Sequence, residues 1–226
     1  MGSQILDLAR SSGVPVPRYD LIAEMPSGIA IVQERLPGRA PEHVDRALVE
    51  SMVATNEQLA GLLAGRPEIP APPMHLDHSA DGFCVHESLE RYDDRTRRLL
   101  GWVRAVGRSE PSDMTGDDLV HLDFHTGNVL VDAGNEVCGI VDWDGVGRGD
   151  RRFALVTLRF DLAAPRHGVD PALQAWFDEM LDDVLESSTL RMYWAHMSLR
   201  MVDWAIRHDG PADVTHWLDF AATRAA

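Results

Sequence analysis

Lysine is absent from this sequence: all 21 basic residues among its 226 are arginine. Every permanently charged basic side chain is therefore a planar guanidinium, and a site that requires the compact ammonium group of lysine is excluded. We attribute the preference for arginine to coding bias and assign it no function of its own.

Cysteine and long apolar runs are also scarce. The two cysteines, Cys84 and Cys138, lie far apart in sequence, which argues against a disulfide framework and a paired-cysteine metal site. No apolar run approaches the length that crosses a bilayer, and the first residues lack the charged-then-apolar pattern of a signal peptide. We therefore expect a cytoplasmic protein that does not act at a membrane.

Acidic residues outnumber basic ones, and the net charge is −15. This charge argues against a nucleic-acid partner, whose phosphates would be repelled. A cationic small molecule would suit it, although an acidic, solvated surface is the ordinary interpretation. The length and a hydrophobic content of 45% allow a sizeable core in one large domain or two small ones.

Strands are predicted only near the start and the centre of the chain. We expect a helix over residues 3–12 that ends at Gly13, and strands over Tyr19–Ala23 and Ile29–Gln33. Helical spacing continues over residues 42–63, 85–106 and from 153 onwards, with breaks at Pro165, Pro171 and Pro211. Strands and helices are thus segregated, which favours an α+β fold with a boundary near residue 36.

The polar residues best suited to chemistry gather around a predicted hairpin over residues 129–141. The loop before it reads HLDFHTGN over residues 121–128, and Asp142 follows it. Because Asn128 and Asp142 begin and end the hairpin, we expect them to lie close together, with Asp123 on the preceding loop. Carboxylate and amide oxygens suit Mg²⁺, and a further carboxylate can accept the proton of an acceptor hydroxyl.

The same polar residues also allow purely structural roles, because aspartate and asparagine are common in turns. His121, Asp123 and His125 alternate, so on a strand they would share one face and could bind a transition metal, but no further cluster completes such a site. Some charged residues could meet phosphates or a cationic acceptor, or form ion pairs and solvated faces instead. They are Arg148, Arg151, Arg152, Asp178, Glu179, Asp182, Asp183 and Glu186.

The spacing H-x-D-x-x-x-x-N, followed by an aspartate at a strand end, resembles the catalytic loop and metal-binding aspartate of protein kinases. In detail, residues 121–128 are similar to the H-G-D-x-H-x-G-N of the aminoglycoside phosphotransferase and choline kinase branch. Residues 139–144 resemble its G-x-I-D-W-[DE], and residues 147–150 its G-x-G-D. Residues 14–18 and 34–38 resemble its approach to the hinge.

The resemblance implies a protein-kinase-like α+β fold. Residues 1–36 would form a truncated N-lobe and hinge, with a short helix and about two strands. Residues 37–226 would form a mainly helical C-lobe that carries a catalytic β-hairpin. The implied activity is ATP- and Mg²⁺-dependent O-phosphorylation of a small molecule, such as an aminoglycoside antibiotic; choline-like acceptors fit nearly as well.

The resemblance also implies roles for individual residues. Asp123 would be the catalytic base, while Asn128 and Asp142 would hold Mg²⁺. The adenine of ATP would contact Gln33, Glu34, Arg35 and Leu36. Supporting roles fall to His121, which would brace the loop, and to His125 and Asp144.

The sequence departs from the family pattern before the hinge. No glycine-rich strand–turn–strand precedes Gln33, and the lysine that grips phosphates is missing. We expect the chain to be a fragment, a mis-started reading or a natural truncation. The alternative to an enzyme is a catalytically inactive kinase-like binding or regulatory module. So short an N-lobe would expose the sheet edge that begins at Tyr19, which favours a homodimer through this region.

Overall fold

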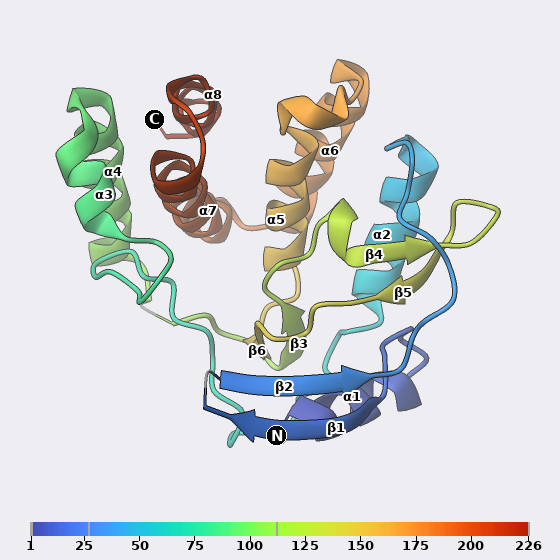
Figure 1. Ribbon diagram of the computed structural model, residues 1–226. Helices are drawn as coiled ribbons and strands as arrows, with labels where there is room; N and C mark the ends of the chain where they lie inside the picture. The colour runs from blue at the N-terminus through green and yellow to red at the C-terminus, as the bar shows by residue number, and fades with distance from the viewer. Residues whose placement is uncertain (1, 27, 112, 226) are drawn as a thin grey trace. The chain divides into compact units, whose positions relative to one another are not determined.

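A computed structural model describes residues 2–26, 28–111 and 113–225. The chain forms two compact units, each assembled from segments that are distant in sequence (Figure 1). Unit 1 comprises residues 1–70 and 116–175, and unit 2 comprises residues 71–115 and 176–226. The lobe boundary expected after residue 36 falls inside unit 1, and the division into lobes stays a prediction.

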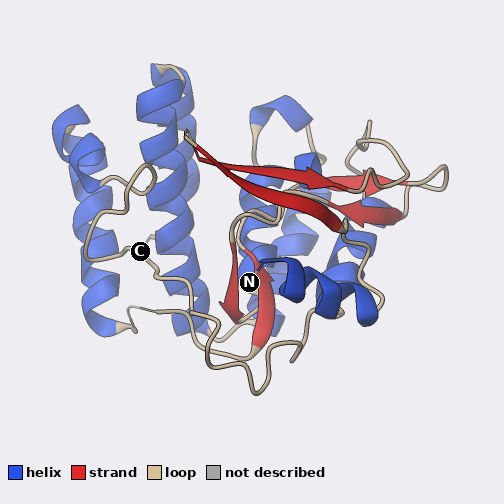
Figure 2. Cartoon of the chain, turned by 60° about the horizontal axis from the view of Figure 1, so that its bottom comes forward, coloured by secondary structure: helices blue, strands red, loops and turns tan. Residues whose placement is uncertain are grey.

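Unit 1 contains three two-stranded antiparallel sheets, β1–β2, β3–β6 and β4–β5, which Figure 2 shows in red. Its first elements are α1 (Gly2–Ser11), β1 (Tyr19–Met25), β2 (Gly28–Gln33) and α2 (Arg46–Glu57). After the segment that belongs to unit 2 come β3 (Asp118–His121), the 3-10 helix η1 (Thr126–Asn128), β4 (Val129–Val131), β5 (Val137–Ile140) and β6 (Val146–Gly149). They are followed by α5 (Phe153–Leu162), η2 (Pro165–His167) and the start of α6 (Pro171–Val184).

The α+β class is confirmed, and two strands, β3 and β6, were missed. β3 pairs with β6 from Asp118 opposite Gly149 to His121 opposite Val146. β6 reads Val-Gly-Arg-Gly and has no strand-forming pattern of its own, so its conformation depends on pairing with a distant segment. The predicted helix over 42–63 is shorter, because the Asp45 side chain caps α2 by accepting a hydrogen bond from the amide of Leu48.

Helix α5 lies in the core of unit 1. All ten of its residues are buried, although Arg159 and Asp161 are charged. A helix that is buried all round provides a rigid element inside a unit, because neighbouring side chains hold it on every face. The charged residues on it must therefore be paired.

The β1–β2 hairpin presents apolar side chains to solvent on both of its faces. Ile29 is 70% exposed. Two strands without a covered face are marginally stable by themselves. The other exposed apolar residues of the hairpin are Leu21, Ile22, Met25, Ile31 and Val32.

Unit 2 is helical. It contains α3 (His86–Tyr92), α4 (Asp94–Ser109), α7 (Ser187–His208), α8 (Pro211–Ala222) and most of α6. The single helix predicted over 85–106 is wrong, because Asp93 ends α3 and caps α4 in a reciprocal pair with Thr96. The same break leaves Tyr92 40% exposed at the end of α3.

His196 makes the stability of unit 2 depend on pH. Its ring is buried, and its Nδ1 lies 2.7 Å from the carbonyl oxygen of Met74. Burial, reinforced by Arg200 and His75 and opposed by the Met74 hydrogen bond, lowers the pKa of His196 from 6.5 to about 4. The unfolded chain therefore binds a proton between these pH values that the folded chain does not.

We expect the contribution of neutral His196 to be fully present above pH 6.5 and to be lost as the pH falls towards 4. At pH 5 the loss in the free energy of unfolding is on the order of 2 kcal/mol. Urea unfolding at pH 7.5 and pH 5 measures it, and His196→Gln should reduce the difference between the two values. An equal difference in parent and variant would assign the pH dependence to other groups.

None of the helices in the described part of the chain combines the length and the apolar character that crossing a bilayer requires.

Candidate active site

The predicted polar residues lie where strand β3 leaves the core of unit 1. β3 ends at His121, and the next amide, of Leu122, donates to the carbonyl oxygen of Gly145 at 3.0 Å. The chain then passes through Asp123 into the short helix η1 and the β4–β5 hairpin. Asp123 is consequently the first partly exposed carboxylate beyond the buried end of a strand.

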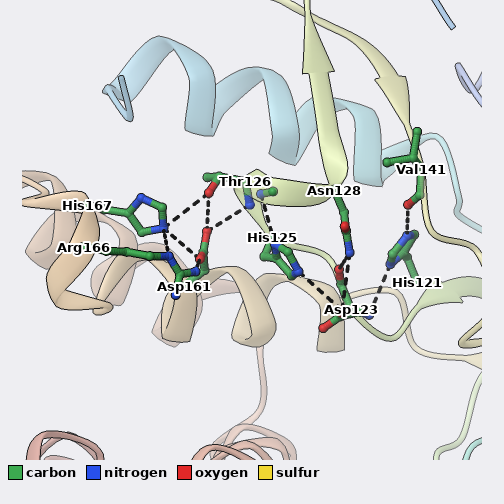
Figure 3. Close-up of polar contacts among 10 residues, drawn as sticks. His121, Asp123, His125, Thr126, Asn128, Val141, Asp161, Arg166 and His167 are labelled. Carbon is green, nitrogen blue, oxygen red and sulfur yellow. Dashed lines mark hydrogen bonds and ion pairs between the residues drawn. The ribbon is translucent and has the colours of Figure 1, made fainter. Parts of the chain in front are cut away.

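His121 braces this loop through both ring nitrogens (Figure 3). The amide N–H of Asp123 donates to Nδ1 at 3.2 Å, so Nδ1 carries no proton. Nε2 then carries it and donates to the carbonyl oxygen of Val141 at 3.0 Å. Burial lowers the pKa of His121, which keeps the ring in this neutral form. The His121 ring thus links Val141, which precedes Asp142, to Asp123.

Asn128 holds the carboxylate of Asp123. Its Nδ2 donates to the backbone oxygen of Asp123 at 2.9 Å and lies 3.4 Å from Oδ2. With the NH₂ group engaged, the amide oxygen is the atom that Asn128 can offer to a cation. The amide of Val141 donates to the carbonyl oxygen of Asn128 at 2.9 Å, which closes the base of the hairpin beside Asp142.

Asp142 adopts a left-handed backbone conformation, with φ of +62°. Such a conformation costs free energy for residues with a Cβ, and Asp and Asn tolerate it best. Its neighbour Trp143 is buried and donates from Nε1 to the carbonyl oxygen of Ile140 at 2.8 Å. The anchored indole holds the turn in place, while the Asp142 carboxylate stays exposed.

His125 approaches Asp123 from the other side. Its Nδ1 accepts a hydrogen bond from the amide of Gly127 at 3.0 Å, which leaves the proton on Nε2. Nε2 lies 3.4 Å from Oδ2 of Asp123. His125 and Asn128 therefore both direct an N–H group at the same carboxylate oxygen, as Figure 3 shows.

The predicted adenine-contacting residues begin at the last residue of strand β2. Glu34 accepts from the amide of Arg18 through Oε2 at 3.2 Å, and its own amide donates to the carbonyl oxygen of Arg18 at 2.8 Å. The Cδ1 atom of Leu36 lies so close to Gly139 that a Cβ there would be 3.1 Å from it, which places Leu36 against β5. Gln33 and Arg35 are exposed.

Tyr19 is a site neighbour that the sequence did not single out. Its pKa is raised by partial burial and by the negative charges of Asp144 and Asp142, so the phenol lies within electrostatic range of both carboxylates. Asp144 is exposed. The proximity arises from the fold, because more than a hundred residues separate β1 from the end of the hairpin.

Asp161 is a second residue that the sequence did not indicate. It accepts hydrogen bonds from Thr126 in the loop between Asp123 and Asn128. A lone aspartate inside the apolar run of α5 was the only available signal, since a charge in such a run demands a partner.

The arginines that follow the hairpin are paired with carboxylates. Arg148 contacts Asp117 at 2.7 Å, and Arg152 contacts Asp150 at 2.8 Å. Arg151 pairs with Asp118 and Glu57. In unit 2, Asp178 and Asp182 of α6 pair with Arg224. These contacts support the interpretation that the charged residues form ion pairs rather than bind phosphates or an acceptor.

The donor set of the site suits a hard cation. The transition-metal alternative fails, because both ring nitrogens of His121 are committed to the backbone. Nor does any group of three or more His, Cys, Asp or Glu side chains among the described residues have the arrangement of a metal site. Mg²⁺ needs no such cage, since it binds through one or two protein oxygens, waters and substrate phosphates. Asp142 and the amide oxygen of Asn128 fit that requirement.

Comparison with known proteins confirms the kinase-like fold that the resemblance implied. The family model described as "Phosphotransferase enzyme family" matches residues 3–186. A thermostable mutant of aminoglycoside phosphotransferase APH(4)-Ia superposes with a TM-score of 0.73 at 16% identity, over 99% of this chain and 81% of that one. An aminoglycoside-3′-phosphotransferase of type VIII superposes with a TM-score of 0.63 at 24% identity, over 88% of this chain and 78% of that one.

A third solved structure is aminoglycoside phosphotransferase APH(3″)-Id from Streptomyces rimosus, in complex with ADP and streptomycin. Its TM-score is 0.52 at 16% identity, over 87% of this chain and 82% of that one. At these identities the solved structures show the fold alone. No curated protein matches the chain.

Proposed function

Because the chain belongs to the phosphotransferase enzyme family, we propose that it transfers the terminal phosphoryl group of ATP to a hydroxyl of a small molecule, with Mg²⁺. The observation that carries the proposal is the convergence of Asp123, Asn128 and Asp142 at the base of one hairpin. Two N–H groups orient the Asp123 carboxylate, while Asp142 is left exposed beside it.

In the proposed reaction Asp123 accepts the proton of the acceptor hydroxyl as its oxygen attacks phosphorus. Asn128 and Asp142 would hold Mg²⁺, which neutralises charge on the phosphates. His121 keeps Asp123 and the end of the hairpin in register through its two backbone hydrogen bonds. Asp144 and His125 would have supporting roles. Positioning of this kind accounts for most of the catalysis in phosphoryl transfer.

The adenine would lie against the hinge, at Gln33, Glu34, Arg35 and Leu36. Leu36 and Leu130 pack over Gly139, where a Cβ would lie 3.1 Å from a Cδ1 atom of each leucine. This supplies an apolar surface beside the site. ADP and the ATP analogue AMP-PNP are present in complexes of APH(4)-Ia, whose fold is similar.

We infer a cationic acceptor and a role in antibiotic resistance in the cytoplasm. The net charge of −15 favours polycations over anions. Complexes of the similar folds contain hygromycin B and streptomycin. An aminoglycoside is therefore the first acceptor to test, and choline-like alcohols are the second.

One observation supports an inactive binding or regulatory module instead. The chain has no lysine, and the two arginines before Arg35 are engaged elsewhere. Arg10 pairs with Asp7 at 3.0 Å, and Arg18 pairs with Asp20 at 2.8 Å. Phosphates would then be held without the usual cation, which predicts weak nucleotide binding.

Mg²⁺-dependent ATP binding, followed by acceptor-stimulated release of ADP, separates the two functions. Calorimetry with and without Mg²⁺ measures binding, and a coupled assay with a panel of aminoglycosides and choline measures turnover. ADP release that depends on both acceptor and Mg²⁺ supports the enzyme. Acceptor binding without turnover supports the binding module, and absence of nucleotide binding contradicts the enzyme.

We also propose a homodimer through the exposed β1–β2 hairpin, whose apolar faces would be covered by a second copy. Ile29→Glu should weaken self-association in sedimentation, because Ile29 is 70% exposed there. Val184→Glu, on α6, is the matched control and should leave it unchanged. A monomer at all concentrations would contradict the dimer.

A further inference from the structure

Asp161 uses both of its carboxylate oxygens to hold other segments of unit 1 (Figure 3). Oδ2 accepts from the amide of Thr126 at 2.9 Å and from its hydroxyl at 2.7 Å. Oδ1 lies 2.5 Å from the guanidinium of Arg166 and 3.0 Å from Nε2 of His167. The side chain is only 3% exposed.

The partners of Asp161 belong to the loop that carries Asp123 and Asn128 and to the segment that follows α5. Thr126 lies between Asp123 and Asn128 and begins η1, the single turn that ends at Asn128. Arg166 and His167 belong to η2, which follows α5. Asp161 itself lies on the completely buried helix of the unit. A short loop that carries two functional side chains is therefore fastened to a helix that is buried along its whole length.

The charge of Asp161 is required for this arrangement. Burial by itself would raise the pKa of Asp161, but the hydrogen bonds from Thr126 and the contact with His167 outweigh it and hold the pKa below its ordinary value. The carboxylate is thus ionised at neutral pH and acts only as an acceptor. The amide and the hydroxyl of Thr126 and the guanidinium of Arg166 are all donors, so each oxygen of the Asp161 carboxylate has a donor partner.

We propose that Asp161 is a positioning residue of the phosphoryl-transfer site, which holds the 123–128 loop through Thr126 so that Asp123 and Asn128 keep their mutual geometry. The inference rests on the proposed function for its kinetic consequence. His121 and Asn128 hold the loop at Asp123, whereas Asp161 holds it at Thr126. A displacement of about 1 Å in such a loop can cost 100-fold in rate.

Asp161→Asn is the direct test, because it preserves shape but replaces one acceptor oxygen by an NH₂ group. The partners on both sides of the side chain are donors, so either orientation of the amide sets donor against donor. We expect kcat to fall about 10- to 100-fold while KM for ATP changes less than about threefold. Thr126→Val removes the hydroxyl, one of the two donors, and should lower kcat by less. Thr126→Ser keeps the hydroxyl and should retain the parent rate.

Asp203→Asn is the matched control for stability. Asp203 is also completely buried, and it accepts from the Ser88 hydroxyl at 2.6 Å and from Arg207 at 2.8 Å, but it lies in unit 2. The Asp203→Asn variant should lower the midpoint of thermal unfolding, as Asp161→Asn should, but it should leave kcat unchanged. Equal kcat values for the parent and Asp161→Asn would overturn the proposal.

Hydrogen–deuterium exchange tests the positioning independently of turnover. In peptides that cover residues 121–131, Asp161→Asn should accelerate amide exchange by at least about tenfold, and Asp203→Asn should not. If Asp161→Asn proves unfolded, Thr126→Val decides with the same two readouts. Should the parent lack turnover altogether, the proposed function fails and exchange alone decides the positioning: unchanged rates would overturn it, and selective acceleration would support it.

Discussion

Asp123→Asn should lower kcat by about 1,000-fold, because it removes the carboxylate that accepts the proton of the acceptor hydroxyl. The substitution preserves shape, and the amide oxygen can still accept from Nδ2 of Asn128, which lies 3.4 Å from Oδ2 in the parent. The backbone hydrogen bonds of the loop to His121 and Asn128 do not involve the carboxylate. Binding of Mg²⁺ and ATP should therefore remain close to that of the parent.

Acceptor-stimulated ADP release measures the loss, and calorimetry measures nucleotide binding. Asp132→Asn is the matched control, since Asp132 lies on the same hairpin away from the site and accepts from the amides of Gly134 and Glu136. An asparagine can accept the same bonds, so kcat should not change. If Asp123→Asn retained more than about a tenth of the parent rate, Asp123 would not be the base.

Asp142→Asn should weaken Mg²⁺-dependent nucleotide binding about 10- to 100-fold and lower turnover at least as much, because the site loses its exposed carboxylate ligand. Asparagine tolerates the left-handed φ of +62°, so stability should remain unchanged. Asp142→Ala should show the same loss of binding together with a decrease of about 1 kcal/mol in the free energy of unfolding. Mg²⁺ titration in the presence of ATP and urea unfolding measure the two effects separately.

Asn135 provides the control for backbone strain. It lies at the tip of the same hairpin with φ of +66°, and Asn135→Ala should cost similar stability without loss of binding. Binding by Asp142→Asn that equals the parent at every Mg²⁺ concentration would exclude Asp142 as a metal ligand.

Much of the local structure near the site follows from short-range patterns. The hairpin from Val129 to Ile140 is encoded by β-branched residues around a turn, and the structure places it as predicted. Gly13 ends α1 with φ of +89°, as its position suggested. Such features are predictable because the residues that decide them are neighbours in sequence.

Other features depended on contacts that no local pattern contains. β6 becomes a strand because it pairs with β3, almost thirty residues before it. The break between α3 and α4, by contrast, is a local feature that the sequence analysis missed, because the Asp93 side chain caps α4 together with Thr96 three residues later. Trp204 is 49% exposed although tryptophan is largely apolar, because burial depends on which face of α7 meets its neighbours.

The sequence by itself determined the chemistry that this protein can offer: the spacing of Asp123, Asn128 and Asp142, and the complete absence of lysine. Spacing along one loop and one hairpin suffices for that, because a turn brings the ends of a hairpin together whatever surrounds it. The tertiary structure alone decided which distant segments pack against these groups. Asp161 and Tyr19 reach the site only because folding packs α5 and β1 beside it, and a distant side chain leaves no spacing in the sequence by which it could be recognised.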